Sequence, residues 1–116
     1  MAVRRIVANI AARDLSATRA FYGEIFGLDL VMDHGWIATY GAPTQMSVQI
    51  SIATEGGSGT PVPDISIEVD DVTAVLECLK QKGIAIAYGP VDEPWGVRRF
   101  FVRDPFGKLI NVLSHI

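Results

Sequence analysis

The sequence predicts an α+β protein made of two tandem copies of one β-α-β-β-β module, and three observations support this fold class. Residues 9–15 align without a gap on residues 66–72, an offset of 57 in a chain of 116 residues. Each copy begins with alternating apolar and polar residues, as in a strand, and continues with apolar residues at helical spacing. A glycine then follows, Gly27 in the first copy and Gly83 in the second, and helices commonly end at glycine.

An aspartate stands between the first strand and the helix of each copy. Asp14 and Asp71 occupy equivalent places, and a side chain of this type can cap the free N–H groups of a helix's first turn. The apolar residues that follow predict that each helix covers one face of a sheet. They are Leu15, Phe21, Tyr22, Ile25 and Phe26 in the first copy, and Val72, Val75, Leu76 and Leu79 in the second.

Three further strands are predicted after each helix. They occupy 29–33, 36–40 and 45–53 in the first copy, and 84–88, 97–103 and 108–114 in the second. His34-Gly35 and Asp104-Pro105-Phe106-Gly107 contain the residues that tight turns require. We therefore predict one domain over 1–116, with modules at about 1–55 and 62–116 and a flexible glycine-rich linker at 55–61 between them.

Strand parity divides the predicted sheet into two faces, because successive side chains point to opposite sides. One set is almost entirely apolar, and we expect it to pack beneath the helices. It comprises Ile6, Ala8, Ile10, Met46, Val48, Ile50, Ile52, Ile65, Ile67, Val69, Ile110 and Val112. The other set is mixed, with Val7, Asn9, Ala11, Ser47, Gln49, Ser51, Asp64, Ser66, Glu68, Leu109, Asn111 and Leu113. A mixed face is either a solvated sheet surface or the wall of a ligand cavity, and parity alone leaves both interpretations open.

Composition and charge argue against several classes of protein. The net charge of -3 provides no general basic field, and Arg98, Arg99 and Arg103 form only a local cluster. We therefore expect neither nucleic acid nor a membrane as a partner. The chain start lacks the apolar core of a signal peptide, and no run approaches the roughly 20 apolar residues that span a bilayer, which predicts a cytoplasmic protein. Cys78 is the single cysteine, and we expect a buried structural thiol in the second helix.

Short motifs at both ends of the chain resemble a known superfamily. Asp14-Leu15, Ala20-Phe21-Tyr22 and Phe26-Gly27-Leu28 stand near the start, and Trp95-Gly96 through Asp104-Pro105-Phe106-Gly107 stand near the end. Together with the repeat, they look like the glyoxalase/bleomycin resistance protein/dioxygenase superfamily, also called the vicinal-oxygen-chelate superfamily. The resemblance implies that the two modules form a curved mixed sheet around a cavity. It favours the cavity-wall interpretation of the mixed face.

The enzymes of that superfamily hold a divalent metal in the cavity, and the resemblance implies where its ligands would fall in this chain. The first-strand positions correspond to Val7 and Asp64, and the last-strand positions to Asn111 and, by parity, Gln49. Valine offers no donor atom, and one carboxylate with two amides is a poor set for zinc, nickel or iron. We therefore predict that the protein holds no metal and no other cofactor. These residues favour a binding protein over an enzyme.

Residues 94–105 resemble the corresponding stretch of bleomycin-resistance-type proteins, which lack the metal, form homodimers and sequester a flat or extended drug. This resemblance predicts a metal-independent protein that binds a small molecule. The molecule is either a drug, whose sequestration would give antibiotic resistance, or a metabolite. The predicted ligand is planar and aromatic, or cationic, and the predicted assembly is a homodimer. The alternatives are a metal-dependent lyase, isomerase or dioxygenase of the same superfamily, and a dimeric interaction protein with a vestigial cavity.

The sequence assigns no catalytic residue, because no Ser-His-Asp or Cys-His arrangement has a recognised spacing. Aromatic residues suit ligand binding because they give a large contact area at a small entropic cost. Each of them has an alternative interpretation as core filler, and Arg98 as a solvated strand residue. The predicted ligand-binding residues are Trp36, Tyr40, Gln49, Asp64, Ser66, Glu68, Trp95, Arg98, Phe101 and Asn111.

Overall fold

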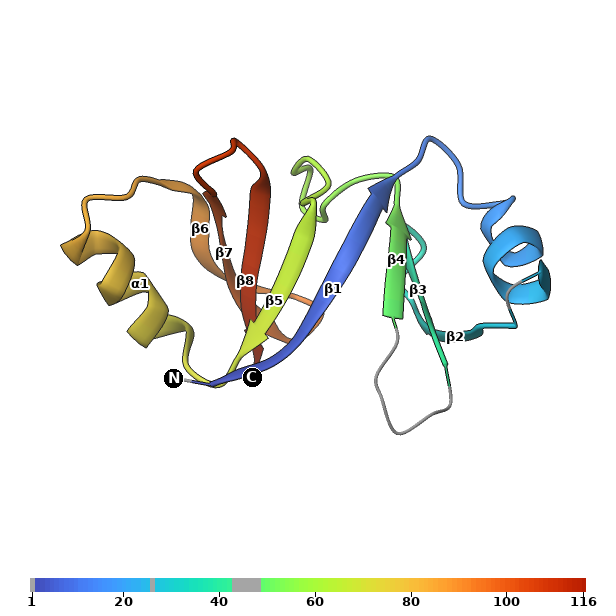
Figure 1. Cartoon of the computed structure of the whole chain (residues 1–116), viewed down its shortest axis with the longest axis horizontal. Coiled ribbons are helices and arrows are strands. Elements are labelled where there is room, and N and C mark those ends of the chain that lie inside the picture. The colour runs from blue at the N-terminus through green and yellow to red at the C-terminus, as the bar shows by residue number, and fades with distance from the viewer. Residues whose placement is uncertain (1, 26, 43–48) are drawn as a thin grey trace. The chain divides into compact units, whose positions relative to one another are not determined.

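The computed structural model describes residues 2–25, 27–42 and 49–116, and these residues form an α+β fold with eight strands, one α-helix and one π-helix (Figure 1). The chain divides into two compact units. The first unit spans Val7–Val62, and the second combines Pro63–Ile116 with Met1–Ile6. Strand β1, Val3–Ala11, contributes residues to both units. No helix of the described residues is long and apolar enough to cross a membrane.

The first unit has the predicted β-α-β-β-β order. Its strands are hydrogen-bonded in the order β2-β3-β4-β1. β1 and β4 are parallel, with Ala8 beside Ile50, while β2, β3 and β4 are antiparallel neighbours. After β1 come η1 (Arg19–Ile25), β2 (Asp29–Asp33), β3 (Ile37–Gly41) and β4 (Gln49–Ala53).

The helix of the first unit differs from the prediction. It is a short π-helix, whose i→i+5 hydrogen bonds change the angular spacing of its side chains. Ile25 is therefore exposed instead of packed, and Asp14 does not cap the helix, since its carboxylate accepts the Ser16 N–H at 2.9 Å. Tyr22 and Leu15 do pack on the small core that Ala38, Tyr40 and Ile52 form. Phe26 lies outside the described residues.

The second unit repeats the same order of elements. Its strands are hydrogen-bonded in the order β5-β8-β7-β6. β5 and β8 are parallel, with Ile65 beside Ile110, and β6, β7 and β8 are antiparallel neighbours. The elements are β5 (Ile65–Val69), α1 (Val72–Gln81), β6 (Ile86–Glu93), β7 (Val97–Arg103) and β8 (Leu109–His115).

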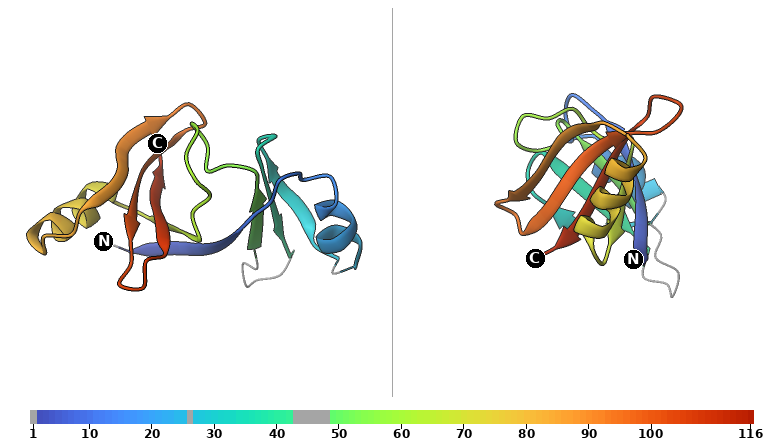
Figure 2. Two further views of the ribbon diagram at one scale, coloured as in Figure 1. Left: turned by 90° about the horizontal axis from the view of Figure 1, so that it is seen from above. Right: turned by 90° about the vertical axis from the view of Figure 1, so that its left-hand side faces the viewer.

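Helix α1 lies against one face of the second unit's strands (Figure 2). Asp71 caps its first turn as predicted, because its Oδ1 accepts the Ala74 N–H at 3.1 Å. Val72 and Leu76, four residues apart, are buried on the same face of the helix. The prediction of a buried Cys78 was wrong: it is exposed, because a residue two positions beyond Leu76 points about 200° around the helix, away from the core.

Strand parity predicted most of the packing. Ile50 and Ile52 lie in the core of the first unit, and four residues of the predicted set lie in the core of the second: Ile67, Val69, Ile110 and Val112. The three residues of the set on β1, Ile6, Ala8 and Ile10, are an exception: all are exposed, Ile6 by 62% and Ile10 by 40%. A helix about 10 Å across covers only about two strands spaced 4.8 Å apart, and neither core cluster includes β1. Met46 and Val48 lie outside the described residues.

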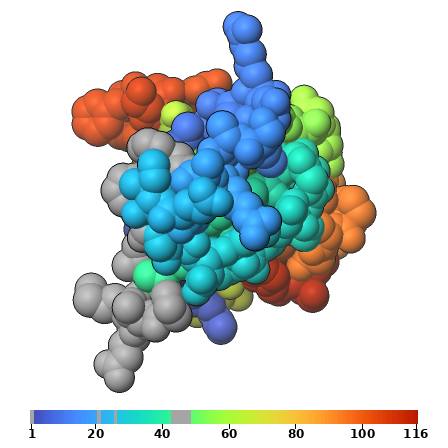
Figure 3. All heavy atoms as spheres, turned by 90° about the vertical axis from the view of Figure 1, so that its right-hand side faces the viewer, coloured from blue at the N-terminus to red at the C-terminus, as the bar shows by residue number. Residues whose placement is uncertain are grey.

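The turns agree with the sequence, but the linker does not. Gly35 has a φ of 85° and donates its N–H to Asp33, and Gly107 donates to the carbonyl of Asp104, closing the projecting hairpin tip (Figure 3). The segment 55–61 is a hydrogen-bonded loop, not the flexible linker that its glycines suggested. Gly56 and Thr60 bond at 2.7 Å, and a Cβ on Gly56 would lie only 2.1 Å from the Pro61 carbonyl oxygen.

Strand β6 is longer than predicted. The sequence predicted an end at Tyr88, since a Gly-Pro pair usually ends a strand, whereas β6 continues to Glu93. Its pairing with β7 shifts register between Tyr88 and Val91, so a bulge takes up Gly89, with a φ of 80°, and Pro90. The peptide bond between these two residues is cis.

Candidate functional site

The candidate site is the face of the second unit's sheet that lies opposite α1. Phe100 and Val112 pack on α1, so their strand neighbours Phe101 and Asn111 point to the other face. Asn111 stands directly beside Phe101 on β7 and beside Ser66 on β5. Three residues from three adjacent strands therefore form one row on this face.

Asn111 is the centre of that row, and the two polar atoms of its side chain differ in their partners. Its side-chain Nδ2 donates to the Ser66 Oγ at 3.1 Å. Its Oδ1 has no hydrogen-bond partner among the described residues. This oxygen is buried, and the whole residue is only 8% exposed. A buried acceptor without a donor costs about 1–3 kcal/mol, so this position is suited to a donor from a bound molecule or from water.

A buried ion pair stands on the same face, beyond Phe101. The Arg99 Nε donates to the Glu93 Oε2 at 2.8 Å, and the Tyr88 hydroxyl donates to the same oxygen at 3.2 Å. The side chains of both Arg99 and Glu93 are only 3% exposed. Two charges removed from water are tolerated only when they are paired and further hydrogen-bonded, which is the arrangement found here.

Three aromatic rings surround the Arg99 guanidinium. Its central carbon Cζ lies 4.8 Å from the ring centroid of Phe101, 4.9 Å from that of Trp95 and 5.4 Å from that of Tyr88. Cations are attracted to the faces of aromatic rings within about 6 Å. Arg99 therefore holds the half-buried Trp95, in the loop after β6, against the sheet.

Two carboxylates complete the polar part of this face. Glu68 Oε1 accepts from the Arg5 Nε, and Glu68 Oε2 lies 3.1 Å from the His115 Nδ1. Burial raises the pKa of Glu68, but the hydrogen bonds and charges of Arg5 and His115 outweigh burial and lower the pKa below its ordinary value. At the start of β5, Asp64 Oδ2 accepts the Leu109 N–H at 2.8 Å.

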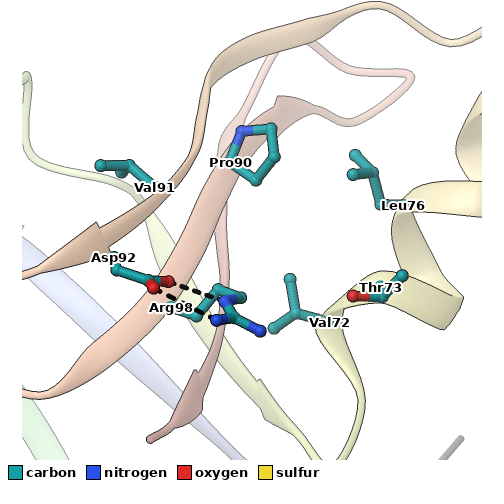
Figure 4. A pocket seen from close by; sticks show the side chains of 7 residues that line it. All are labelled: Val72, Thr73, Leu76, Pro90, Val91, Asp92 and Arg98. Atoms are coloured by element: carbon teal, nitrogen blue, oxygen red, sulfur yellow. Dashed lines mark hydrogen bonds and ion pairs between the residues drawn. The ribbon is translucent and has the colours of Figure 1, made fainter.

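Arg98, a predicted ligand-binding residue, lies on the opposite face. It pairs with Asp92, with its Nε 2.7 Å from the Asp92 Oδ1. This hydrogen bond and the opposite charge raise the pKa of Arg98 and lower that of Asp92. The pair borders a groove of about 440 Å³ beside α1 (Figure 4). The groove is lined by Val72, Thr73, Leu76, Pro90, Val91, Asp92 and Arg98.

The predicted residues of the first unit have local partners. Tyr40 is buried in the core, and its hydroxyl lies 3.1 Å from the Thr18 Oγ1. Trp36 is half-buried and stacks on His34, with ring centroids 6.2 Å apart. Gln49 is half-buried and begins β4, beside Gly41 of β3.

Arg99, Glu93 and Tyr88 are residues of this face that were not among the predicted ligand-binding residues. Parity contained the signal for Arg99, since it shares a face with Phe101 whereas Arg98 does not. Glu93 had no such signal, because the predicted strand ended five residues earlier and the bulge in β6 determines which way Glu93 points.

The residues present do not fit a divalent metal at the positions that the resemblance implied. Val7 is buried and has no donor atom, Asp64 is bonded by a backbone N–H, and the Asn111 amide bonds to Ser66. Within residues 2–25, 27–42 and 49–116, no three histidine, cysteine or acidic side chains lie close enough together to hold a metal. The donor chemistry therefore differs from the sets that zinc and similar metals prefer.

Comparison with solved structures shows the fold over nearly the whole chain. A structure from Legionella pneumophila described as an NAD-dependent benzaldehyde dehydrogenase is 12% identical with a TM-score of 0.75, covering 97% of this chain and 100% of that one. A variant of the Streptomyces coelicolor methylmalonyl-CoA epimerase, in complex with 2-nitronate-propionyl-CoA, is 22% identical with a TM-score of 0.72, covering 98% and 99%.

A third solved structure has the same description as the matching family model. It is a glyoxalase/bleomycin resistance protein/dioxygenase superfamily member from Vibrio splendidus, 16% identical with a TM-score of 0.65, covering 99% of this chain and 100% of that one. The family model of the Glyoxalase/Bleomycin resistance protein/Dioxygenase superfamily matches residues 4–112. The β-α-β-β-β repeat and this match lead to one conclusion: the chain belongs to the glyoxalase/bleomycin resistance protein/dioxygenase superfamily.

Proposed function

We propose that this protein binds a small organic molecule without a metal, in the manner of bleomycin-resistance-type proteins, on the face formed by Ser66, Trp95, Phe101 and Asn111. The observation that carries the proposal is the buried Asn111 Oδ1, which accepts no hydrogen bond from the residues that the structure describes. Native proteins satisfy nearly all of their buried polar atoms, so an exception beside an aromatic ring supports a role in binding. We also propose that the protein is a homodimer, as the family resemblance implies, and that it is located in the cytoplasm.

The surroundings of Asn111 support binding of a flat molecule. Trp95 is half-buried, and one face of its indole covers the Arg99 guanidinium. Ligand sites typically combine aromatic and apolar surface with a few fixed polar groups. The half-buried Trp95 supplies the aromatic surface here, Phe101 is a buried ring (1% exposed) that contacts Arg99 as Trp95 does, and Ser66 and Asn111 supply the polar groups.

A fluorescence titration tests this proposal. The chain contains two tryptophans, Trp36 and Trp95, so a Trp36→Phe background leaves Trp95 as the only indole. A planar ligand found by thermal-shift screening should quench its fluorescence. Trp95→Ala, compared in the unmodified chain, should weaken the affinity about thirtyfold, because loss of an aromatic anchor costs about 2 kcal/mol or more. An affinity within about twofold of the wild type would contradict the role of Trp95.

Elemental analysis separates this proposal from the alternative of a metal-dependent enzyme. The purified chain should contain no stoichiometric zinc, nickel, manganese or iron, and its melting temperature should not change on chelation. The reason is that Val7 and the two engaged side chains Asp64 and Asn111 provide a poor donor set. Near-stoichiometric metal, with binding lost on chelation, would favour the enzyme.

A further inference from the structure

We infer that the ligand is an uncharged planar molecule that donates a hydrogen bond, from a hydroxyl or an amide N–H, to the Asn111 Oδ1. This inference rests on the proposed function and names the class of ligand. The alternative, a cationic ligand, requires a free carboxylate or a free aromatic cage on this face.

Two carboxylates of this face, the buried Glu93 and the partly buried Glu68, already have cationic partners within the chain. Glu68 accepts from Arg5 and His115, and Glu93 accepts from Arg99 and Tyr88. A ligand cation would have to displace Arg99 from a buried pair, where an unpaired charge is strongly unfavourable, or displace Arg5 from a partly buried pair. Asp64 is exposed to solvent and one of its oxygens holds the Leu109 N–H, so water screens its attraction for a cation.

The aromatic cage is also occupied. Tyr88, Trp95 and Phe101 all lie within 5.4 Å of the Arg99 Cζ, so the rings that would attract a cation already surround one from the chain. The two ion pairs of this face are each neutral, because Glu93 pairs with Arg99 and Glu68 pairs with Arg5. Neither pair therefore favours a cationic ligand over a neutral one.

The remaining polar requirement is for a donor. The Asn111 Nδ2 already donates to Ser66, whereas its Oδ1 accepts from no group of the described residues. A carbonyl oxygen accepts only from N–H or O–H groups. A ligand that offers only acceptors would leave this oxygen unsatisfied, and a ligand with a hydroxyl or amide would satisfy it.

Three matched naphthalene probes distinguish these classes in a calorimetric or NMR titration of the full chain. 2-Naphthol offers a neutral donor, 2-methoxynaphthalene offers only an acceptor, and 2-naphthylmethylamine is a cation at neutral pH. We expect 2-naphthol to bind about three- to tenfold more tightly than the methoxy compound, as one net hydrogen bond allows. We also expect the cation to be the weakest of the three. Preference for the cation or for the methoxy compound would overturn the inference.

Matched variants locate the preference at Asn111. Asn111→Leu keeps the volume and removes the acceptor, so the ratio between 2-naphthol and the methoxy compound should fall to about one. Gln81→Leu, which removes an exposed amide at the end of α1, should leave the ratio as in the wild type. Asn111→Asp keeps an acceptor and should keep the preference for the donor over the methoxy compound. An unchanged ratio in Asn111→Leu would overturn the inference.

Failure of the inference differs from failure of the proposed function. If all three probes bind, compete with one another and depend on Trp95, but in the wrong order, the site exists and its ligand class is wrong. If none of them binds at millimolar concentration, the proposed function fails, and the inference that rests on it fails as well. The wild-type series alone decides the order if Asn111→Leu does not fold.

Discussion

At the scale of single residues, two adjacent arginines illustrate what determines a side chain's role in this protein. Arg98 and Arg99 have the same chemistry and neighbouring positions on β7, yet strand alternation sends them to opposite faces. Arg98 pairs with Asp92 in solvent, whereas Arg99 is buried with Glu93 among three aromatic rings. Exposed pairs contribute little to stability, and a buried pair is costly to break.

The first prediction compares these two arginines. Arg99→Met should lower the free energy of unfolding by about 3–5 kcal/mol, because it leaves the Glu93 carboxylate buried without its cation. Arg98→Met should change it little, since Asp92 returns to water. Urea unfolding followed by circular dichroism measures both. Equal effects of the two substitutions would contradict the buried ion pair.

The second prediction concerns Glu68 and pH. Arg5 and His115 overcome the effect of burial and hold the pKa of Glu68 below its ordinary value. Its contribution to stability is therefore fully present above the unfolded-state pKa and is lost as pH falls through the lower, folded-state pKa. Glu68→Gln should unfold at lower urea than the wild type at neutral pH, and this difference should shrink below about pH 4.3. A difference that stays constant down to acid pH would contradict the assignment.

At the scale of elements, the residues that cap a helix predicted α1 correctly but predicted the first helix only in part. The Asp71 cap and Gly83, with a φ of 70°, bound α1 at its two ends as the sequence indicated. The first helix had the same kind of signals, and there Asp14 bonded Ser16 while a π-helix formed instead of the predicted α-helix. The capping residues therefore predicted that a helix forms in both places. They predicted the type of helix and its first residue correctly only for α1.

The third prediction tests the cap of α1. Asp71→Ala should lower the free energy of unfolding by about 1 kcal/mol, because the Ala74 N–H loses its acceptor. Asp71→Asn retains a capping oxygen and should retain most of this stability. Thermal and urea unfolding of the three chains measure the difference. A loss of stability as large in the asparagine variant as in the alanine variant would show that charge, not capping, is responsible.

At the scale of the whole molecule, the superfamily match and the solved structures agree on the fold, while identities of 12 to 22% among the three structures compared leave function to be argued from the site. Those relatives include a protein described as an epimerase and one described as a dehydrogenase. The site of this chain must be tested on its own residues.

The fourth prediction is a homodimer, which the resemblance to bleomycin-resistance-type proteins implies. Ile6 and Ile10 leave an apolar strand face exposed in the single chain, and contact with a second copy would remove such a face from water. Analytical ultracentrifugation at micromolar concentration should give twice the 12.6 kDa mass of one chain. A species with the mass of one chain would contradict this assembly.

The amino-acid sequence by itself determined the repeat, the α+β class, the order of elements and most core positions, because these depend on periodicity and on turn residues that act locally. It also placed Ser66 and Asn111 on one face, since parity is a local property. Tertiary structure decided the rest. The bulge at Gly89-Pro90 turned Glu93 toward Arg99, and the limited width of a helix left Ile6 and Ile10 exposed. The first outcome depends on how β6 pairs with β7, and the second on where the helices pack on the strands, and the periodicity of a single segment encodes neither.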